Sequence, residues 1–139
     1  MIEAGMYFKF GQKARPDIKS KGTFEAIENG ERTSTTRFPE DSPAQFKKFQ
    51  RLRPGDQIRF WEGRWKNGSF QGRSLTVTVK GTLPINISTM SHEDKETWSR
   101  AEGWRPQVLE EFKARGRSSG LQILYELHEP PEETQKTLL

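Results

Sequence analysis

Residues 75–79 constrain the fold most, because apolar and polar residues alternate there without a break. Successive side chains of a strand point to opposite faces of a sheet. The three apolar residues of the segment would therefore share one face and its two threonines the other. The pattern predicts a strand with one buried face.

Other short segments, separated by glycine and proline, predict more strands and several short helices. Ser91 with Asp94 three residues later is typical of a helix start, and Ser42 before Pro43 predicts a second start. Further strands are predicted at residues 6–10, 33–38, 57–61, 82–87 and 121–127, a hairpin connection at 62–72, and helices at 23–28, 43–52, 91–101 and 107–114. About five or six strands with short peripheral helices predict an α+β fold, a small β-barrel.

The length of 139 residues and the composition limit the class of protein. We expect one domain over residues 1–128 and a flexible, acidic, proline-containing tail at 129–139. No apolar window approaches the roughly 18 residues of a membrane span, and no secretory signal is evident. A cytoplasmic protein with no membrane contact is therefore expected.

The absence of cysteine and the presence of only two histidines limit the chemistry. Disulfides, zinc ribbons, thiolate nucleophiles and iron–sulfur clusters are excluded. We expect no metal and no cofactor, so any catalysis would depend on hydroxyl, carboxylate and guanidinium groups.

Positive charge is concentrated in the first part of the chain. Residues 1–80 carry 16 Lys/Arg and 9 Asp/Glu, and residues 81–139 carry 7 and 10. Such an excess favours a polyanionic partner, most simply nucleic acid. Solubility alone is an equally simple explanation.

A basic loop at residues 11–22 carries candidate phosphate-binding residues, although a solvated loop has the same composition. They are Lys13, Arg15, Lys19 and Lys21.

A second candidate surface interleaves aromatic and basic residues, namely Trp61, Arg64 and Trp65. Bases stack on Trp and Arg with little sequence preference. The alternative is that both tryptophans cover an end of the barrel.

One arrangement resembles a known family. A predicted helix ends at Gly30, the stretch 31–37 follows, and the turn 53–56 (Arg-Pro-Gly-Asp) enters a strand about twenty residues later. In this order and spacing, residues 7–127 resemble an ASCH domain of the PUA-like superfamily. The resemblance implies a PUA-like β-barrel and a cleft, lined by the stretch 30–37, that receives RNA or a nucleobase.

The threonine within this stretch is similar to that of a bacterial ASCH branch that deacylates N4-acylated cytidine. The resemblance assigns Thr35 to the threonine of that branch, Arg37 to its closing arginine and Glu102 to its glutamate. Arg32 stands where the family has lysine. An arginine cannot act as a base in a protein, but it can stabilise an oxyanion.

Two functions follow. The first is binding of RNA or a modified nucleobase or nucleoside, with Arg32 and Arg37 meeting phosphate. The alternative is a metal-free amidohydrolase acting on N4-acetylcytidine-like nucleosides, with Thr35 as nucleophile, Glu102 as acid or base and Arg32 at the oxyanion. Arg32 reaches Thr35 only from a turn before the strand, because positions 32 and 35 fall on opposite strand faces. A protein partner is not indicated.

Overall fold

A computed structural model describes residues 1–128, except for the side chains of Arg64, Trp65 and Phe70. The predicted tail at 129–139 lies outside the described residues. Within that part of the chain, no helix is long and apolar enough to cross a membrane.

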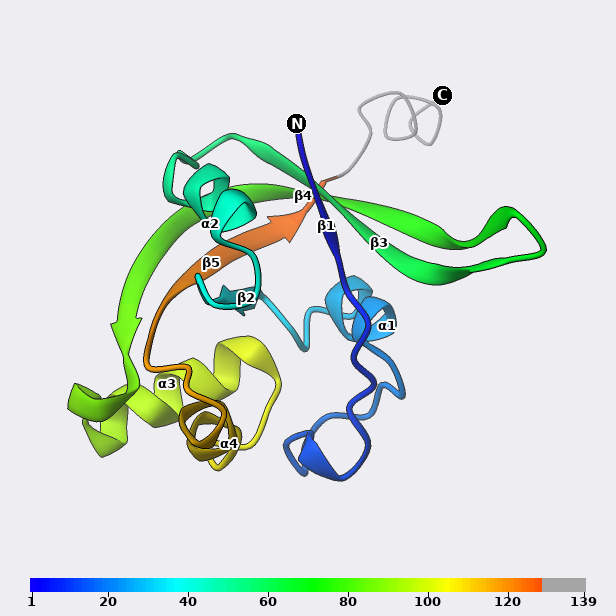
Figure 1. Cartoon of the computed structure of the whole chain (residues 1–139). Coiled ribbons are helices and arrows are strands. Elements are labelled where there is room, and N and C mark those ends of the chain that lie inside the picture. The colour runs from blue at the N-terminus through cyan, green and yellow to red at the C-terminus, as the bar shows by residue number, and fades with distance from the viewer. Residues whose placement is uncertain (129–139) are drawn as a thin grey trace, which may run out of the picture.

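Five strands form one mixed sheet in the order β1-β3-β4-β5-β2 (Figure 1). β1 pairs with β3 in parallel, and the other neighbours are antiparallel. The strands are β1 (Ile2–Gly5), β2 (Ser34–Arg37), β3 (Gln57–Lys66), β4 (Ser69–Asn86) and β5 (Ser119–Leu127). The α+β class is confirmed.

The predicted barrel is not confirmed, because the sheet is open and β1 and β2 are its two edges. In a closed barrel, backbone hydrogen bonds would pair these two edges. Here a side-chain hydrogen bond connects them instead. Arg37 Nη2 at the end of β2 donates to Gly5 O at the end of β1, at 2.9 Å. Each edge strand is only four residues long, and between them lies the space in which the candidate site forms.

β4 joins two segments that the sequence separates. Its first part pairs with β3 and its second with β5, and the register shifts between Val79 and Gly81. The predicted strands 75–79 and 82–87 are therefore one element with a bulge, because a bulge lets a strand bend without ending. Figure 1 shows how strongly β4 bends along its length.

The first strand begins earlier than predicted. β1 covers Ile2–Gly5, where Ile2 is paired with Ile58 of β3. The predicted segment 6–10 is a connection anchored by buried Met6 and Phe10. Alternating apolar residues occur in both stretches. Residues 2–5 form the strand because they are the ones that pair with β3.

Two helices start at the capping residues that the sequence predicts. Ser91 and Asp94 form a capping box, and the Ser42 side chain accepts from Gln45 N. Gly103 ends a helix in the left-handed conformation (φ 76°), which glycine adopts at little cost. The helices are η1 (Gly11–Lys13), α1 (Thr23–Glu28), α2 (Pro43–Gln50), η2 (Ile87–Thr89), α3 (His92–Glu102) and α4 (Val108–Ala114).

Two apolar cores lie beside the edge strand β2. One joins the sheet to α1 and α2 and includes Phe49. The other lies under α3 and α4 and includes Trp98. β2 contacts both, since the Arg37 guanidinium lies 5.7 Å from the Phe49 ring and Trp98 Nε1 donates to Thr36 Oγ1 at 2.9 Å.

Gly120 of β5 has no side chain, and the ring of Phe38, the residue that follows β2, packs against it. An added Cβ would lie 2.7 Å from the Phe38 ring and 2.8 Å from Arg37 O. We expect Gly120→Ala to lower the free energy of unfolding by about 1–3 kcal/mol, the usual cost of overpacking. Urea unfolding measures the change. Gly81→Ala is the control, because no heavy atom lies within 4 Å of a Cβ there; an equal loss in both variants would contradict the steric explanation.

Candidate functional site

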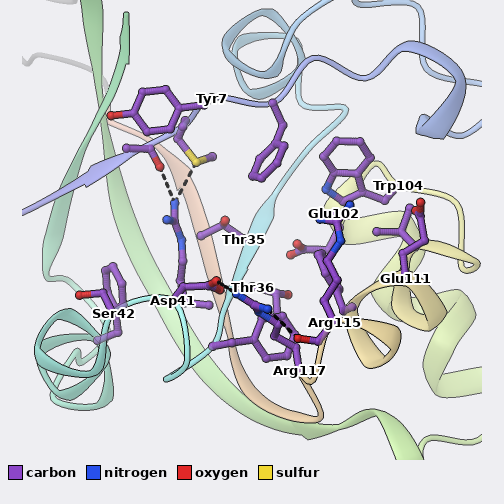
Figure 2. Close-up of a pocket in the computed structure, with 18 of the residues that line it drawn as sticks. Tyr7, Thr35, Thr36, Asp41, Ser42, Glu102, Trp104, Glu111, Arg115 and Arg117 are labelled. Carbon is purple, nitrogen blue, oxygen red and sulfur yellow. Dashed lines mark hydrogen bonds and ion pairs between the residues drawn. The ribbon is translucent and has the colours of Figure 1, made fainter. Parts of the chain in front are cut away.

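A cavity of about 480 Å³ lies between the sheet edges and the helical layer. β2 is an edge strand, so side chains from both of its faces reach this cavity. Figure 2 shows Thr35, Thr36 and Glu102 pointing into it. The other lining residues are Gly5, Met6, Tyr7, Phe8, Lys13, Arg32, Arg37, Phe38, Asp41, Ser42, Gln45, Phe46, Phe49, Trp104, Val108, Glu111, Phe112, Arg115 and Arg117.

Arg32 is buried, with 4% of its surface exposed, in the turn just before β2. Its backbone N–H donates to Ala26 O at 3.1 Å. Its Nε donates to Ser34 O and its Nη2 to Thr35 Oγ1, both at 3.1 Å. Arg32 thus meets the condition for reaching Thr35, because it precedes the strand. Its Nη1 is buried without a hydrogen-bond partner among the described residues.

Glu102 is the last residue of α3 and is 2% exposed. It accepts a hydrogen bond from the Ser34 hydroxyl. Ser34 is itself held by Gln122 Nε2 at 2.9 Å, and its carbonyl accepts from Tyr125 OH at 3.3 Å. The end of α3 is thus connected through Ser34 to β5.

Burial raises the pKa of the Glu102 carboxyl, because desolvation disfavours its charged form. The positive charge of Arg32 and hydrogen bonds from Ser34 and Thr36 oppose this rise. Burial also disfavours the charged form of Arg37. Together with the positive charge of Arg32, it lowers the pKa of Arg37 to about 10. Arg37 therefore remains protonated at neutral pH, while Glu102 binds a proton more tightly than an exposed carboxyl does.

Arg37 extends along the cavity toward β1. Its Nη2 contacts Gly5 O and, at 3.1 Å, Met6 Sδ. Its Nε is buried without a hydrogen-bond partner among the described residues. Both interior guanidinium groups therefore keep an N–H donor for which the described part of the chain supplies no acceptor.

Three of the aromatic residues that line the cavity, Tyr7, Phe8 and Trp104, were not among the site residues predicted from the sequence. Tyr7 and Phe8 are 70% and 60% exposed. Phe8 meets Trp104 edge-on at 6.0 Å, and the Arg32 guanidinium lies 5.8 Å from the Trp104 ring. Two adjacent aromatic residues in a polar chain can indicate a binding surface. Tyr7 and Phe8 were not considered as such, because residues 6–10 were predicted to be a strand.

Charged residues surround the mouth of the cavity. Lys13 pairs with Glu111 at 3.3 Å, and Arg117 pairs with Asp41 at 2.5 Å. Arg115 is exposed and lines the same opening. Lys13 was a sequence candidate, whereas Arg115 and Arg117 were not, because they follow a short helix in the half of the chain with no excess of basic residues.

The structure separates the remaining candidates from the cavity. Arg15, Lys19, Lys21 and Trp61 do not line it. Arg15 pairs with Asp17 at 2.7 Å, and Trp61 on β3 lies beside Arg59, 5.9 Å from its guanidinium. The side chains of Arg64 and Trp65 are outside the described residues.

No ligand set for a metal ion was found in the described part of the chain, where no group of three or more His, Asp or Glu side chains is suitably placed.

Comparisons with known proteins show a fold relationship. No family model matches the sequence, and no curated protein matches it. Among solved structures, it is similar to EF3133 from Enterococcus faecalis V583, which is described by the family label DUF984. The TM-score is 0.52 at 13% identity, over 98% of this chain and 82% of that one. The chain therefore shares the fold of a DUF984 protein.

The raised pKa of Glu102 predicts a pH dependence of stability. The folded protein holds a proton that the unfolded chain releases above about pH 4.5. Stability should therefore fall as pH rises from there to the folded pKa, by up to about 1.4 kcal/mol per pH unit. Urea unfolding from pH 4.5 to 8 should show that Glu102→Gln removes this contribution. Glu93→Gln, at an exposed position of the same helix, should keep the wild-type slope; identical slopes in all three proteins would contradict the assignment.

Proposed function

We propose that this protein binds a nucleobase, as a nucleoside or as a splayed base of RNA, in the cavity beside β2. The observation that carries the proposal is the convergence of Arg32, Thr35, Arg37 and Glu102 on one cavity. Its volume of about 480 Å³ lies in the usual range for small-ligand sites.

The hydrogen-bonding groups suit the edge of a base. A carboxylate accepts from an exocyclic amine such as that of cytosine, and Glu102 is such a group. Arg32 Nη1 and Arg37 Nε are donors without acceptors among the described residues, and base carbonyls are acceptors. Buried polar groups are normally hydrogen-bonded, so a ligand with this pattern would complete the network.

The aromatic side chains that line the cavity suit the face of a base. Unpaired bases stack on aromatic side chains, and Tyr7 and Phe8 present exposed rings at the cavity. In Figure 2, Tyr7 and Trp104 lie on two sides of the opening. A base that enters between them would bring its edge toward Glu102.

The resemblance of the stretch 30–37 to an ASCH domain supports the same ligand class. We propose that the curved sheet is a PUA-like variant, in which Arg37 connects β2 to β1 in place of backbone pairing. The fold shared with EF3133 agrees with an α+β domain of this size and adds nothing on the ligand.

Calorimetric titration with the four ribonucleosides and a short single-stranded RNA tests the binding function. Arg32→Met should weaken binding about ten-fold or more, because the variant loses the unpartnered donor while it keeps most of the side-chain volume. Arg100→Met, on an exposed face of α3, is the matched control and should bind like the wild type. Absence of binding to every probe would refute the proposal, and an equal loss in both variants would refute the role of Arg32.

A second candidate function is hydrolysis of an N4-acyl cytidine. The observation that favours it is the hydrogen bond from Arg32 Nη2 to Thr35 Oγ1, which leaves the hydroxyl proton of Thr35 available to a base. Glu102 lines the same cavity, and burial raises its proton affinity.

The proposed reaction passes through an acyl-threonine intermediate. Thr35 Oγ1 attacks the acyl carbon as ionised Glu102 takes its proton, and Arg32 stabilises the oxyanion. The C–N bond then breaks and Glu102 returns the proton to the amine nitrogen. Water hydrolyses the acyl-threonine ester, which releases the carboxylic acid and restores Thr35.

Incubation with N4-acetylcytidine should release cytidine and acetate, which chromatography detects. Thr35→Val should abolish the release, because the isosteric side chain has no nucleophile. Thr33→Val is the control, since Thr33 is exposed and does not line the cavity. Arg32→Lys should raise turnover by restoring a side chain that can act as a base. Wild-type protein that leaves a panel of acylated nucleosides intact would exclude this candidate.

A further inference from the structure

The cavity has an interior and a mouth that differ in exposure. Arg32, Thr35 and Glu102 are buried at its interior end. Lys13, Asp41, Glu111 and Arg115 are exposed, and Arg117 is half-buried. A ligand that fills the cavity would therefore have one desolvated end and one end in contact with water.

Positive charge exceeds negative charge around the cavity. Among the described lining residues, five are basic and three acidic. With Glu102 ionised, the excess is two positive charges. The interior guanidinium groups of Arg32 and Arg37 hydrogen-bond to neutral atoms. Such a cavity attracts an anionic ligand.

Two arginines are arranged side by side at the mouth. Arg117 Nη1 donates to Arg115 O at 2.7 Å, and its other terminal nitrogen pairs with Asp41. Arg115 forms no ion pair with any residue that the structure describes. Figure 2 shows both arginines on one side of the opening and Tyr7 on the other. One guanidinium is thus fixed by the fold, and its neighbour is available.

We infer that the ligand is a nucleoside monophosphate whose phosphate binds Arg115 and Arg117 at the mouth while its base occupies the interior. This inference rests on the proposed binding function and specifies its ligand class. Guanidinium groups match the oxygens of a phosphate with paired, charge-assisted hydrogen bonds. With Lys13 included, the basic groups of the rim exceed the carboxyls of Asp41 and Glu111 by one charge.

The position of Glu102 at the interior end favours binding of the phosphate at the mouth. A phosphate at the interior end would lie beside the Glu102 carboxyl, and two acidic groups in a buried space repel each other. At the mouth, Asp41 and Glu111 are already paired with Arg117 and Lys13. The phosphate also keeps part of its hydration there, which lowers the cost of desolvation.

The test compares each ribonucleoside with its 5′- and 3′-monophosphate by calorimetry on the full chain at low salt. At least one monophosphate should bind about ten-fold or more tightly than its nucleoside, and salt should reduce the ratio. Arg115→Gln and Arg117→Gln should each bring the two affinities closer together. Lys113→Gln is the matched control, because Lys113 is exposed on α4 and does not line the cavity.

Each result separates the two proposals. Equal affinity for nucleoside and monophosphate would overturn the phosphate site and leave the nucleobase proposal intact. A ratio unchanged in both arginine variants would also overturn the phosphate site. If no probe binds, both proposals fail. Should Arg117→Gln not fold without the Asp41 pair, Arg115→Gln remains decisive, since Arg115 is exposed and makes no ion pair in the described structure.

Discussion

Arg32 and Arg37 bring two guanidinium groups into the interior of a small protein. Buried charge is costly unless it is paired or hydrogen-bonded, so the surrounding structure depends on how these groups are satisfied. Arg32 is held by Ser34 O and Thr35 Oγ1, and Arg37 by Gly5 O and Met6 Sδ. These contacts fix the entry to β2, the exit from β2 and the distance between the two sheet edges.

This arrangement also explains why the site has its particular chemistry. Glu102 interacts electrostatically with both arginines, yet it forms hydrogen bonds with hydroxyl groups and no ion pair with either arginine. A direct ion pair with an arginine would have neutralised the Glu102 carboxylate and occupied its oxygens. Because the charges stay separate, donors and an acceptor remain directed at a cavity, as expected of a site that binds a polar ligand.

Much of the secondary structure was predictable from local rules. Helix caps at Ser42 and Ser91 and the apolar alternation at 75–79 depend only on residues two or three positions apart. The elements that they predict were confirmed. The first strand and the continuity of β4 were not predictable, because each depends on register with a partner strand. The sheet stays open for a similar reason: whether its edges pair depends on β1 and β2, which are separated by 28 residues of the chain.

Within the site, the sequence identified Arg32, Thr35, Arg37 and Glu102 through the family resemblance and Lys13 through the basic loop, and all five line the cavity. It did not identify Tyr7, Phe8, Arg115 or Arg117, since their role as lining residues depends on which loops meet at the opening. The sequence by itself determined the types of group available: no thiol, few imidazoles, and abundant guanidinium, hydroxyl and carboxyl groups. Only the tertiary structure decided which of them share one enclosed space, because burial and proximity arise when α3, α4 and the residue 6–10 connection pack around one edge strand.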